Sequence, residues 1–141
     1  MARVFWDAML FIYLMEDDPV FGERVSQLRA RSFERGDEIC TSALALGEIL
    51  AGMYRDRTVA EAEQVRDDIV ASGVKILPFD LAASSRFGLL RAKYRKSAAD
   101  TIHLSCAAAA GVDLFLTGDK ALLNLHVDGI KFIAGINTDL L

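Results

Sequence analysis

Residues Ser97 to Lys120, SAADTIHLSCAAAAGVDLFLTGDK, hold the pattern that decides the fold. Apolar residues recur there at helical spacing until Gly111, a residue typical of a helix C-terminus. The apolar run at 113–117 then predicts a short buried strand. Asp100 stands at the start of the predicted helix, and Asp119 directly follows the predicted strand. We therefore expect a helix, a tight turn and a strand, with a carboxylate at each end of the unit.

The rest of the chain repeats this alternation of helices and short apolar strands. A chain of 141 residues with 52% hydrophobic content suits one domain with a sizeable core. Short strands alternating with helices are typical of a parallel sheet covered on both faces. We predict a single α/β domain over residues 1–141, with three α/β/α layers around a central, mostly parallel five-stranded sheet. The other four strands are expected at Arg3–Trp6, Glu38–Thr41, Val74–Leu77 and Ile130–Ile133.

Helices between these strands are predicted from apolar spacing and capping residues. Ser42, Thr58 and Asp80 are typical N-cap residues. In the helix that is predicted to end at Gly36, Phe33 is expected on the apolar side. The predicted helices cover residues 8–15, 20–35, 43–54, 58–72 and 121–125, with a further helix after Asp80.

Composition and charge restrict the class of protein. The mean hydropathy is +0.26, but no apolar run approaches the roughly 20 residues that a membrane-spanning helix needs. Asp7 interrupts the apolar segment after Arg3, which disfavours a secretory signal, so we expect a cytoplasmic protein. Cys40 and Cys106 form no CxxC pair and are expected to be buried free thiols. The net charge of −4 means that a nucleic-acid role would need a local basic patch.

Three further features of the acidic residues point to chemistry. Asp7 follows the first predicted strand, so it lies at the same carboxyl edge of a parallel sheet as Asp119. Each of Asp7, Asp100 and Asp119 is equally well explained, taken alone, as a helix cap. Glu48 lies on a small apolar helix face without a neighbouring cation, so it either turns to water or has a partner such as a metal ion.

Asp7, Glu48, Asp100 and Asp119 can form one acidic pocket. Two carboxylates about 4 Å apart repel by roughly 4 kcal/mol at an effective dielectric constant near 20, so such a pocket must bind protons or a cation. Oxygen ligands without cysteine or clustered histidine favour Mg²⁺ or Mn²⁺. These ions activate water and stabilise the charge that develops in phosphodiester cleavage. Thr117 can add a hydroxyl to the metal site.

At these residues the sequence resembles the PIN-domain ribonucleases, and most closely the VapC-like toxins of toxin–antitoxin pairs. The resemblance covers the whole chain. The family pattern is an Asp after the first strand, a Glu in the helix after the second, an Asp that opens a late helix and an Asp after the fourth strand. Asp7, Glu48, Asp100 and Asp119 fill those places in order. The resemblance implies that these four acids are catalytic, bind Mg²⁺ or Mn²⁺ and direct the endonucleolytic cleavage of RNA.

The resemblance also implies partners and contacts. VapC-like toxins pair with a small antitoxin protein and commonly form homodimers. RNA must reach an acidic pocket on an acidic protein, so a positive rim is expected around it. The candidate RNA-binding residues are Arg91, Lys93, Arg95, Lys96 and Lys120, for which a solvated helix face is the alternative.

Two departures from the family pattern keep other functions open. Met9 stands where the family usually has Asn or Ser, so a catalytically silent binding module is one alternative. A phosphohydrolase of the haloacid-dehalogenase type is another, but its mechanism needs a second Asp at the position of Met9. His103 lies one helical turn after Asp100, where it is either a packed or exposed helix residue, a donor to a metal ligand or a phosphate contact.

Overall fold

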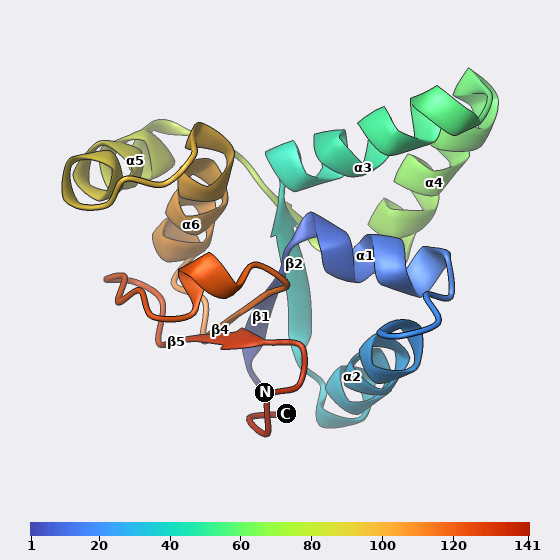
Figure 1. Ribbon diagram of the computed structural model, residues 1–141, viewed down its shortest axis with the longest axis horizontal. Coiled ribbons are helices and arrows are strands. Elements are labelled where there is room, and N and C mark those ends of the chain that lie inside the picture. Colours follow the sequence, from blue (N-terminus) through green and yellow to red (C-terminus); the bar gives the residue numbers. More distant parts are fainter.

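A computed structural model describes residues 1–141 and has a five-stranded sheet at its centre (Figure 1). All four strand pairings are parallel, and the strands lie in the order β3-β2-β1-β4-β5. The predicted fold class is therefore confirmed. The strands are β1 (Arg3–Trp6), β2 (Glu38–Ser42), β3 (Lys75–Leu77), β4 (Leu114–Thr117) and β5 (Phe132–Gly135).

The sheet order creates a point at which the chain changes direction across the sheet. From β1 the chain builds outward through β2 to β3, and it then returns to add β4 on the other side of β1. The ends of β1 and β4 lie side by side, and the Asp7 N–H donates to the Leu116 carbonyl at 3.1 Å. In open parallel sheets this switch point is where ligands bind. Asp7 and Asp119, which follow these two strands, therefore emerge at the same edge.

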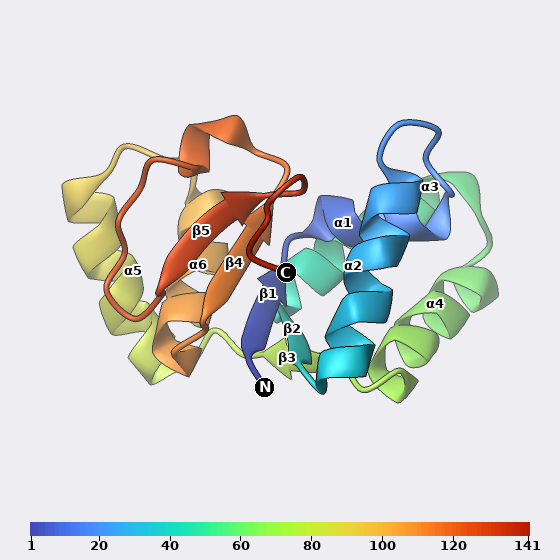
Figure 2. The same cartoon turned by 90° about the horizontal axis from the view of Figure 1, so that it is seen from below.

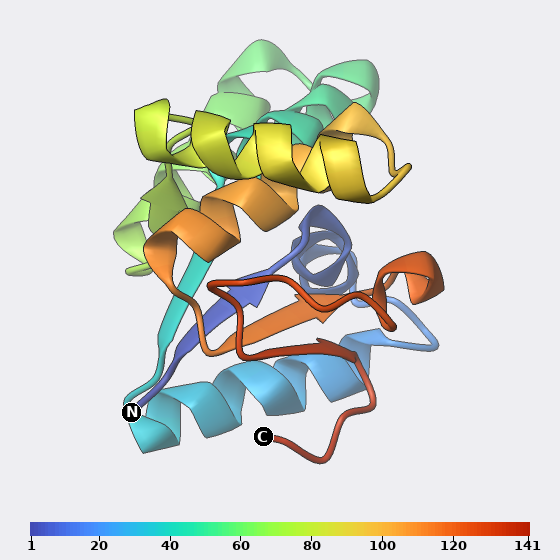
Figure 3. The ribbon, with the colours of Figure 1, turned by 90° about the vertical axis from the view of Figure 1, so that its left-hand side faces the viewer.

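Helices cover both faces of the sheet (Figures 2 and 3). Residues of α1 to α4 pack on one face and residues of α5 and α6 on the other. The helices are α1 (Ala8–Met15), α2 (Gly22–Arg35), α3 (Ala43–Asp56), α4 (Val59–Ala71), α5 (Leu81–Lys93), α6 (Ala98–Ala110) and the short 3₁₀ helix η1 (Lys120–Leu122).

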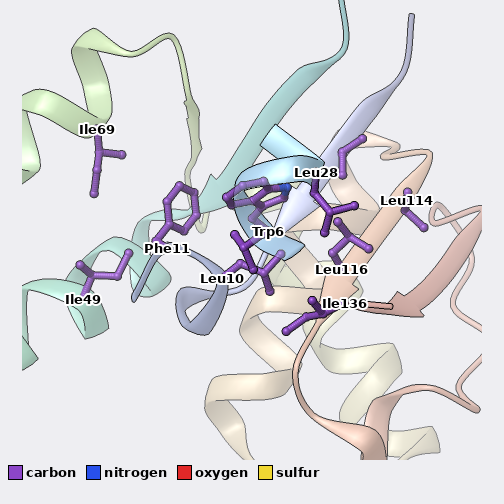
Figure 4. Packing of buried hydrophobic residues seen from close by; sticks show 11 residues of the cluster. Trp6, Leu10, Phe11, Leu28, Ile49, Ile69, Leu114, Leu116 and Ile136 are labelled. Atoms are coloured by element: carbon purple, nitrogen blue, oxygen red, sulfur yellow. The ribbon is translucent and has the colours of Figure 1, made fainter. Parts of the chain in front are cut away.

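The strands alternate their side chains between two buried layers. Val4 and Trp6 of β1 join the cluster beneath α1 to α4, which Figure 4 shows, whereas Phe5 joins the cluster beneath α6. Phe115 of β4 stacks on Phe5 with ring centroids 4.5 Å apart. Because both faces are buried, these strands appear in the sequence as continuous apolar runs. Burial on both faces holds the ends of β1 and β4 rigidly in place.

Local signals set most helix ends as predicted. Ser42, Thr58 and Asp80 all accept a backbone N–H as N-caps, and Gly111 ends α6 in the left-handed conformation with φ 67°. Gly129 also has a positive φ, of 96°, and a Cβ there would lie 2.5 Å from the Ala108 carbonyl oxygen. Only glycine allows this loop to approach α6 so closely.

Three expectations about local structure were wrong. Phe33 is 86% exposed, and Ser32 takes the buried position instead, because it continues the helical face of Val25 and Leu28. The last strand is Phe132–Gly135 rather than Ile130–Ile133, since Phe132 is the residue in register with Leu114 of β4. The last helix is the 3₁₀ turn Lys120–Leu122 rather than 121–125.

Two expectations from composition can be compared with the structure. Cys40 and Cys106 are free and buried, as predicted. None of the helices has the length and apolar character needed to cross a membrane.

Candidate active site

Asp7 anchors the candidate site at the end of β1. It is the N-cap of α1, and its Oδ1 accepts the N–H groups of Met9 at 3.1 Å and Leu10 at 3.4 Å. Its Oδ2 accepts the Thr117 hydroxyl at 2.6 Å and the Gly118 N–H at 2.9 Å. Burial raises the pKa of the Asp7 carboxyl above its ordinary value, and these hydrogen bonds partly oppose the rise. The carboxylate is thus held in one orientation by groups from both central strands.

Thr117 joins two of the predicted acids at the end of β4. Its hydroxyl donates to Asp7 and accepts the Asp119 N–H at 3.0 Å. Asp119 in turn caps η1, because its Oδ1 accepts the Ala121 N–H at 2.9 Å. We expected Thr117 as a metal ligand, whereas its hydroxyl proton in this structure is committed to the carboxylate of Asp7.

Glu48 has a protein partner that the sequence did not identify. His103 Nε2 lies 2.7 Å from Glu48 Oε1, and His103 Nδ1 lies 2.6 Å from the hydroxyl of Ser42. His103 is buried among its neighbours, whereas the Glu48 side chain is 42% exposed. Of the roles considered for His103, the structure therefore shows a packed donor to the predicted metal ligand. Because both ring nitrogens are engaged, neither is free for a phosphate group.

Asp100 is the least constrained of the four acids. Ser97 caps α6 and accepts the Asp100 N–H at 3.1 Å, so Asp100 lies in the first turn of that helix. Its carboxylate makes no hydrogen bond or ion pair in the structure, unlike those of Asp7, Glu48 and Asp119. It is therefore free to turn toward a cation.

All four acids line one cavity of about 340 Å³ at the carboxyl edge of the sheet. They come from four different elements, since Asp7 follows β1, Glu48 is on α3, Asp100 is on α6 and Asp119 follows β4. Figure 1 shows the N-terminal turns of α1 and α6 on either side of this edge. The sequence therefore predicted correctly that these acids share one pocket. Met9, Ile12, His103, Phe115 and Leu122 complete its wall, together with Ala8, Thr117 and Gly118.

The donor set of this cavity fits a hard divalent cation. Four carboxylates without a cysteine are the ligand type that Mg²⁺ and Mn²⁺ prefer. No three of the chain's Asp, Glu, His and Cys side chains converge closely enough to form a preassembled metal centre. The hydrogen bonds account for this spacing, because they hold Asp7, Glu48 and Asp119 each toward a different protein donor.

The predicted RNA-binding residues lie outside the acidic cavity. Arg91 donates to the Lys96 carbonyl at 2.7 Å, and Lys93 lies 5.2 Å from the ring centroid of Tyr94. Lys120 lines a neighbouring cavity, which shares Thr117 and Gly118 with the acidic one. Arg95 and Lys96 occupy the connection from α5 to α6, just before the turn that carries Asp100. Contact of this group with RNA stays a prediction.

A comparison with protein-family models identifies the family. The model described as PIN domain matches residues 4–127, a range that includes all four acids of the cavity. The chain belongs to the PIN domain family. This membership favours the predicted PIN fold over the haloacid-dehalogenase alternative. No curated protein matches the sequence.

Solved structures resemble this PIN domain in fold at low sequence identity. DNA-bound VapBC from Salmonella typhimurium has a TM-score of 0.73 at 18% identity, and the alignment covers 96% of this chain and 99% of that one. VapBC2 from Rickettsia felis, bound to a DNA fragment from its promoter, has a TM-score of 0.70 at 17% identity and covers 94% and 98%. VapC20 from Mycobacterium tuberculosis, a Sarcin-Ricin loop cleaving toxin, has a TM-score of 0.67 at 14% identity and covers 87% and 96%. At such identities the likeness establishes the fold.

Proposed function

We propose that this PIN domain is a metal-dependent endoribonuclease and the toxin of a toxin–antitoxin pair. The observation that carries the proposal is the convergence of four carboxylates from four elements on one cavity at the switch point of the sheet. The names of the structural neighbours support it, because they include toxin–antitoxin complexes and a toxin that cleaves the Sarcin-Ricin loop.

The side chains of the cavity divide the work of holding Mg²⁺ or Mn²⁺. Asp7, oriented by four hydrogen bonds, and the unconstrained Asp100 are the principal ligands in this proposal, with Asp119 and Glu48 completing the site. A bound ion supplies an activated water and neutralises charge on the scissile phosphate. Thr117 keeps the carboxylate of Asp7 ionised and aligned by donating to it.

The positive rim is part of the proposal. Arg91, Lys93, Arg95, Lys96 and Lys120 lie on α5, on the α5–α6 connection and on η1, where they contact RNA phosphates in this proposal. Reversal of charge at Arg95 and Lys96 is expected to weaken RNA binding and to reduce its salt dependence by about one counterion per lost contact. Unchanged RNA affinity and salt dependence would remove these residues from the interface.

The antitoxin is assigned to an apolar groove on the other side of α1. The groove has a volume of about 360 Å³, and 9 of its 13 lining residues are hydrophobic. Phe11 and Met53 contribute to it, and Arg29 and Arg57 lie at its border. Trp6 is the single tryptophan of the chain and also lines the groove, so its fluorescence is expected to change when a partner is removed. A homodimer is proposed from the family resemblance alone.

The decisive experiment is cleavage of a mixed RNA substrate with Mn²⁺, Mg²⁺ or EDTA after removal of any partner. We expect metal-dependent cuts that disappear in Asp7→Asn and Asp100→Asn. Asp128→Asn is the matched control, because the Asp128 side chain is 93% exposed and lies outside the acidic cavity. Cleavage that survives both site substitutions would refute the nuclease assignment.

A silent binding module is the second candidate function. Met9 favours it, because this side chain lines the acidic cavity and offers no polar group to a cation. A silent module would tolerate Glu48→Gln without loss of metal response or RNA binding. A working nuclease site would lose cleavage in the same variant.

A further inference from the structure

We propose that His103 is a positioning residue that, together with Ser42, fixes the carboxylate of Glu48 inside the acidic cavity. The catalytic consequence of this arrangement rests on the proposed nuclease function. The arrangement itself rests on a chain of two short contacts, from Ser42 to His103 at 2.6 Å and from His103 to Glu48 at 2.7 Å.

The contact with His103 is the only hydrogen bond made by the Glu48 side chain. That side chain is 42% exposed and projects from α3 without a cation beside it, so water and several rotamers compete for it. His103, by contrast, is 6% exposed and Ser42 is fully buried. The buried pair is therefore the fixed part of the arrangement, and the half-exposed carboxylate is the part that it orients.

The pattern of donors places the proton on Nε2 of His103. The Ala45 N–H donates to the Ser42 oxygen at 2.9 Å, which leaves the Ser42 hydroxyl proton free to donate to Nδ1. No other acceptor for that hydroxyl is present, and a hydroxyl proton buried without an acceptor is costly. A carboxylate only accepts, so Nε2 must donate to Glu48. The neighbouring Phe5 ring, at 6.3 Å and 50°, borders the imidazole.

The contacts close a ring that joins three elements. Ala45 and Glu48 belong to successive turns of α3, Ser42 ends β2, and His103 belongs to α6. The position of Glu48 therefore depends on how α6 docks on the sheet, and Asp100 lies one turn earlier on the same helix. Two acids of the proposed metal site are in this way placed by one helix.

Two substitutions of His103 separate positioning from packing. In His103→Gln the side-chain amide reaches the place of Nε2 and can still donate to Glu48. In His103→Asn the shorter amide reaches only the place of Nδ1, so the contact with Glu48 is lost. Both variants insert an amide at the same buried position, so similar free energies of unfolding are expected. Ser42→Ala is less informative, because it also removes the N-cap of α3.

The experiment measures Mn²⁺ affinity by calorimetry, the imidazole tautomer by ¹⁵N NMR, and cleavage kinetics. We expect wild type to carry its proton on Nε2, and His103→Asn to lose about 10- to 100-fold in Mn²⁺ affinity, the usual cost of removing a group that orients a metal ligand. His103→Gln is expected to recover most of that loss, and kcat is expected to follow the same order with KM for RNA little changed.

Equal Mn²⁺ affinity in both variants and wild type would overturn the proposal, as would a proton found on Nδ1. Failure of the nuclease assignment would be recognised separately. In that case Asp7→Asn and Asp100→Asn leave cleavage unchanged, or wild type does not bind Mn²⁺. The tautomer still decides whether the Ser42, His103 and Glu48 contacts exist as described.

Discussion

The hydroxyl of Thr117 offers the sharpest test of the site, through the variant Thr117→Val. Valine has nearly the shape of threonine, and Thr117 is 1% exposed, so packing is kept while the donor to Asp7 is removed. A hydrogen bond to a charged group contributes about 1.5–3 kcal/mol. We expect Thr117→Val to lower the free energy of unfolding by about that amount near neutral pH. Thr117→Ser, which keeps the hydroxyl, is expected to cost only about 0.8 kcal/mol for the lost methyl group.

The dependence of this loss on pH follows from the pKa of Asp7. Burial raises that pKa in the folded protein, so Asp7 favours the native state while it is protonated, and this contribution is lost as pH rises through the folded pKa. The Thr117 hydrogen bond is the strongest influence that lowers the pKa of Asp7. Without it the pKa rises further, so the difference in stability between wild type and Thr117→Val must widen from acid to neutral pH.

Urea unfolding in EDTA at several pH values measures this difference. Thr41→Val is the matched control, because the Thr41 hydroxyl is equally buried and donates to the uncharged Trp6 carbonyl at 2.7 Å. Its cost, about 0.5–1.5 kcal/mol for a neutral hydrogen bond, should not vary with pH. A Thr117→Val cost that is equally independent of pH would show that the hydroxyl does not serve the Asp7 carboxylate, and the reasoning would be refuted.

Three further predictions concern other side chains. Asp100→Asn is expected to leave stability in EDTA unchanged or raise it, because the carboxylate has no partner to lose, while the thermal shift produced by Mn²⁺ shrinks; differential scanning fluorimetry measures both, and an undiminished shift contradicts the shared site. Burial raises the pKa of Cys40 to about 12 and that of Cys106 to about 11, so iodoacetamide should modify neither thiol near pH 8 until denaturant is added, as mass spectrometry would show. Hydrogen bonds from the Arg3 N–H and from Lys131 lower the pKa of Asp113, so its contribution to stability is present above the ordinary carboxyl pKa and is lost as pH falls through the folded value. Asp113→Asn should therefore flatten the fall of unfolding free energy in acid, and an unchanged slope would count against the interaction.

The fold was readable from the sequence because its signals are local. The apolar runs of β1 and β4 are continuous since both faces of those strands are buried, and Ser42, Thr58 and Asp80 act as caps within a few residues of their own positions. The errors arose where a nonlocal contact decides. The start of β5 is set by its register with β4, and the exposure of Phe33 is set by which face of α2 meets the sheet.

The acids of the candidate site were also predictable, because strand order and helix position place them. Asp7 and Asp119 follow neighbouring parallel strands, and a parallel sheet brings such residues to one edge. The roles of their partners were less accessible. Thr117 was expected as a metal ligand, yet its hydroxyl lies 2.6 Å from Asp7, because the register of β1 with β4 aligns the ends of the two strands.

The sequence by itself determined the order of helices and strands and the four carboxylates, since both depend on spacing along the chain. Only the tertiary structure decided which protein group each carboxylate meets. Ser42, Glu48 and His103 are separated by up to 61 residues and come from three elements, and no periodicity in the chain links them. Their contacts exist because α3 and α6 both begin beside the carboxyl ends of the central strands, and the packing of those helices fixes distances that a sequence pattern does not encode.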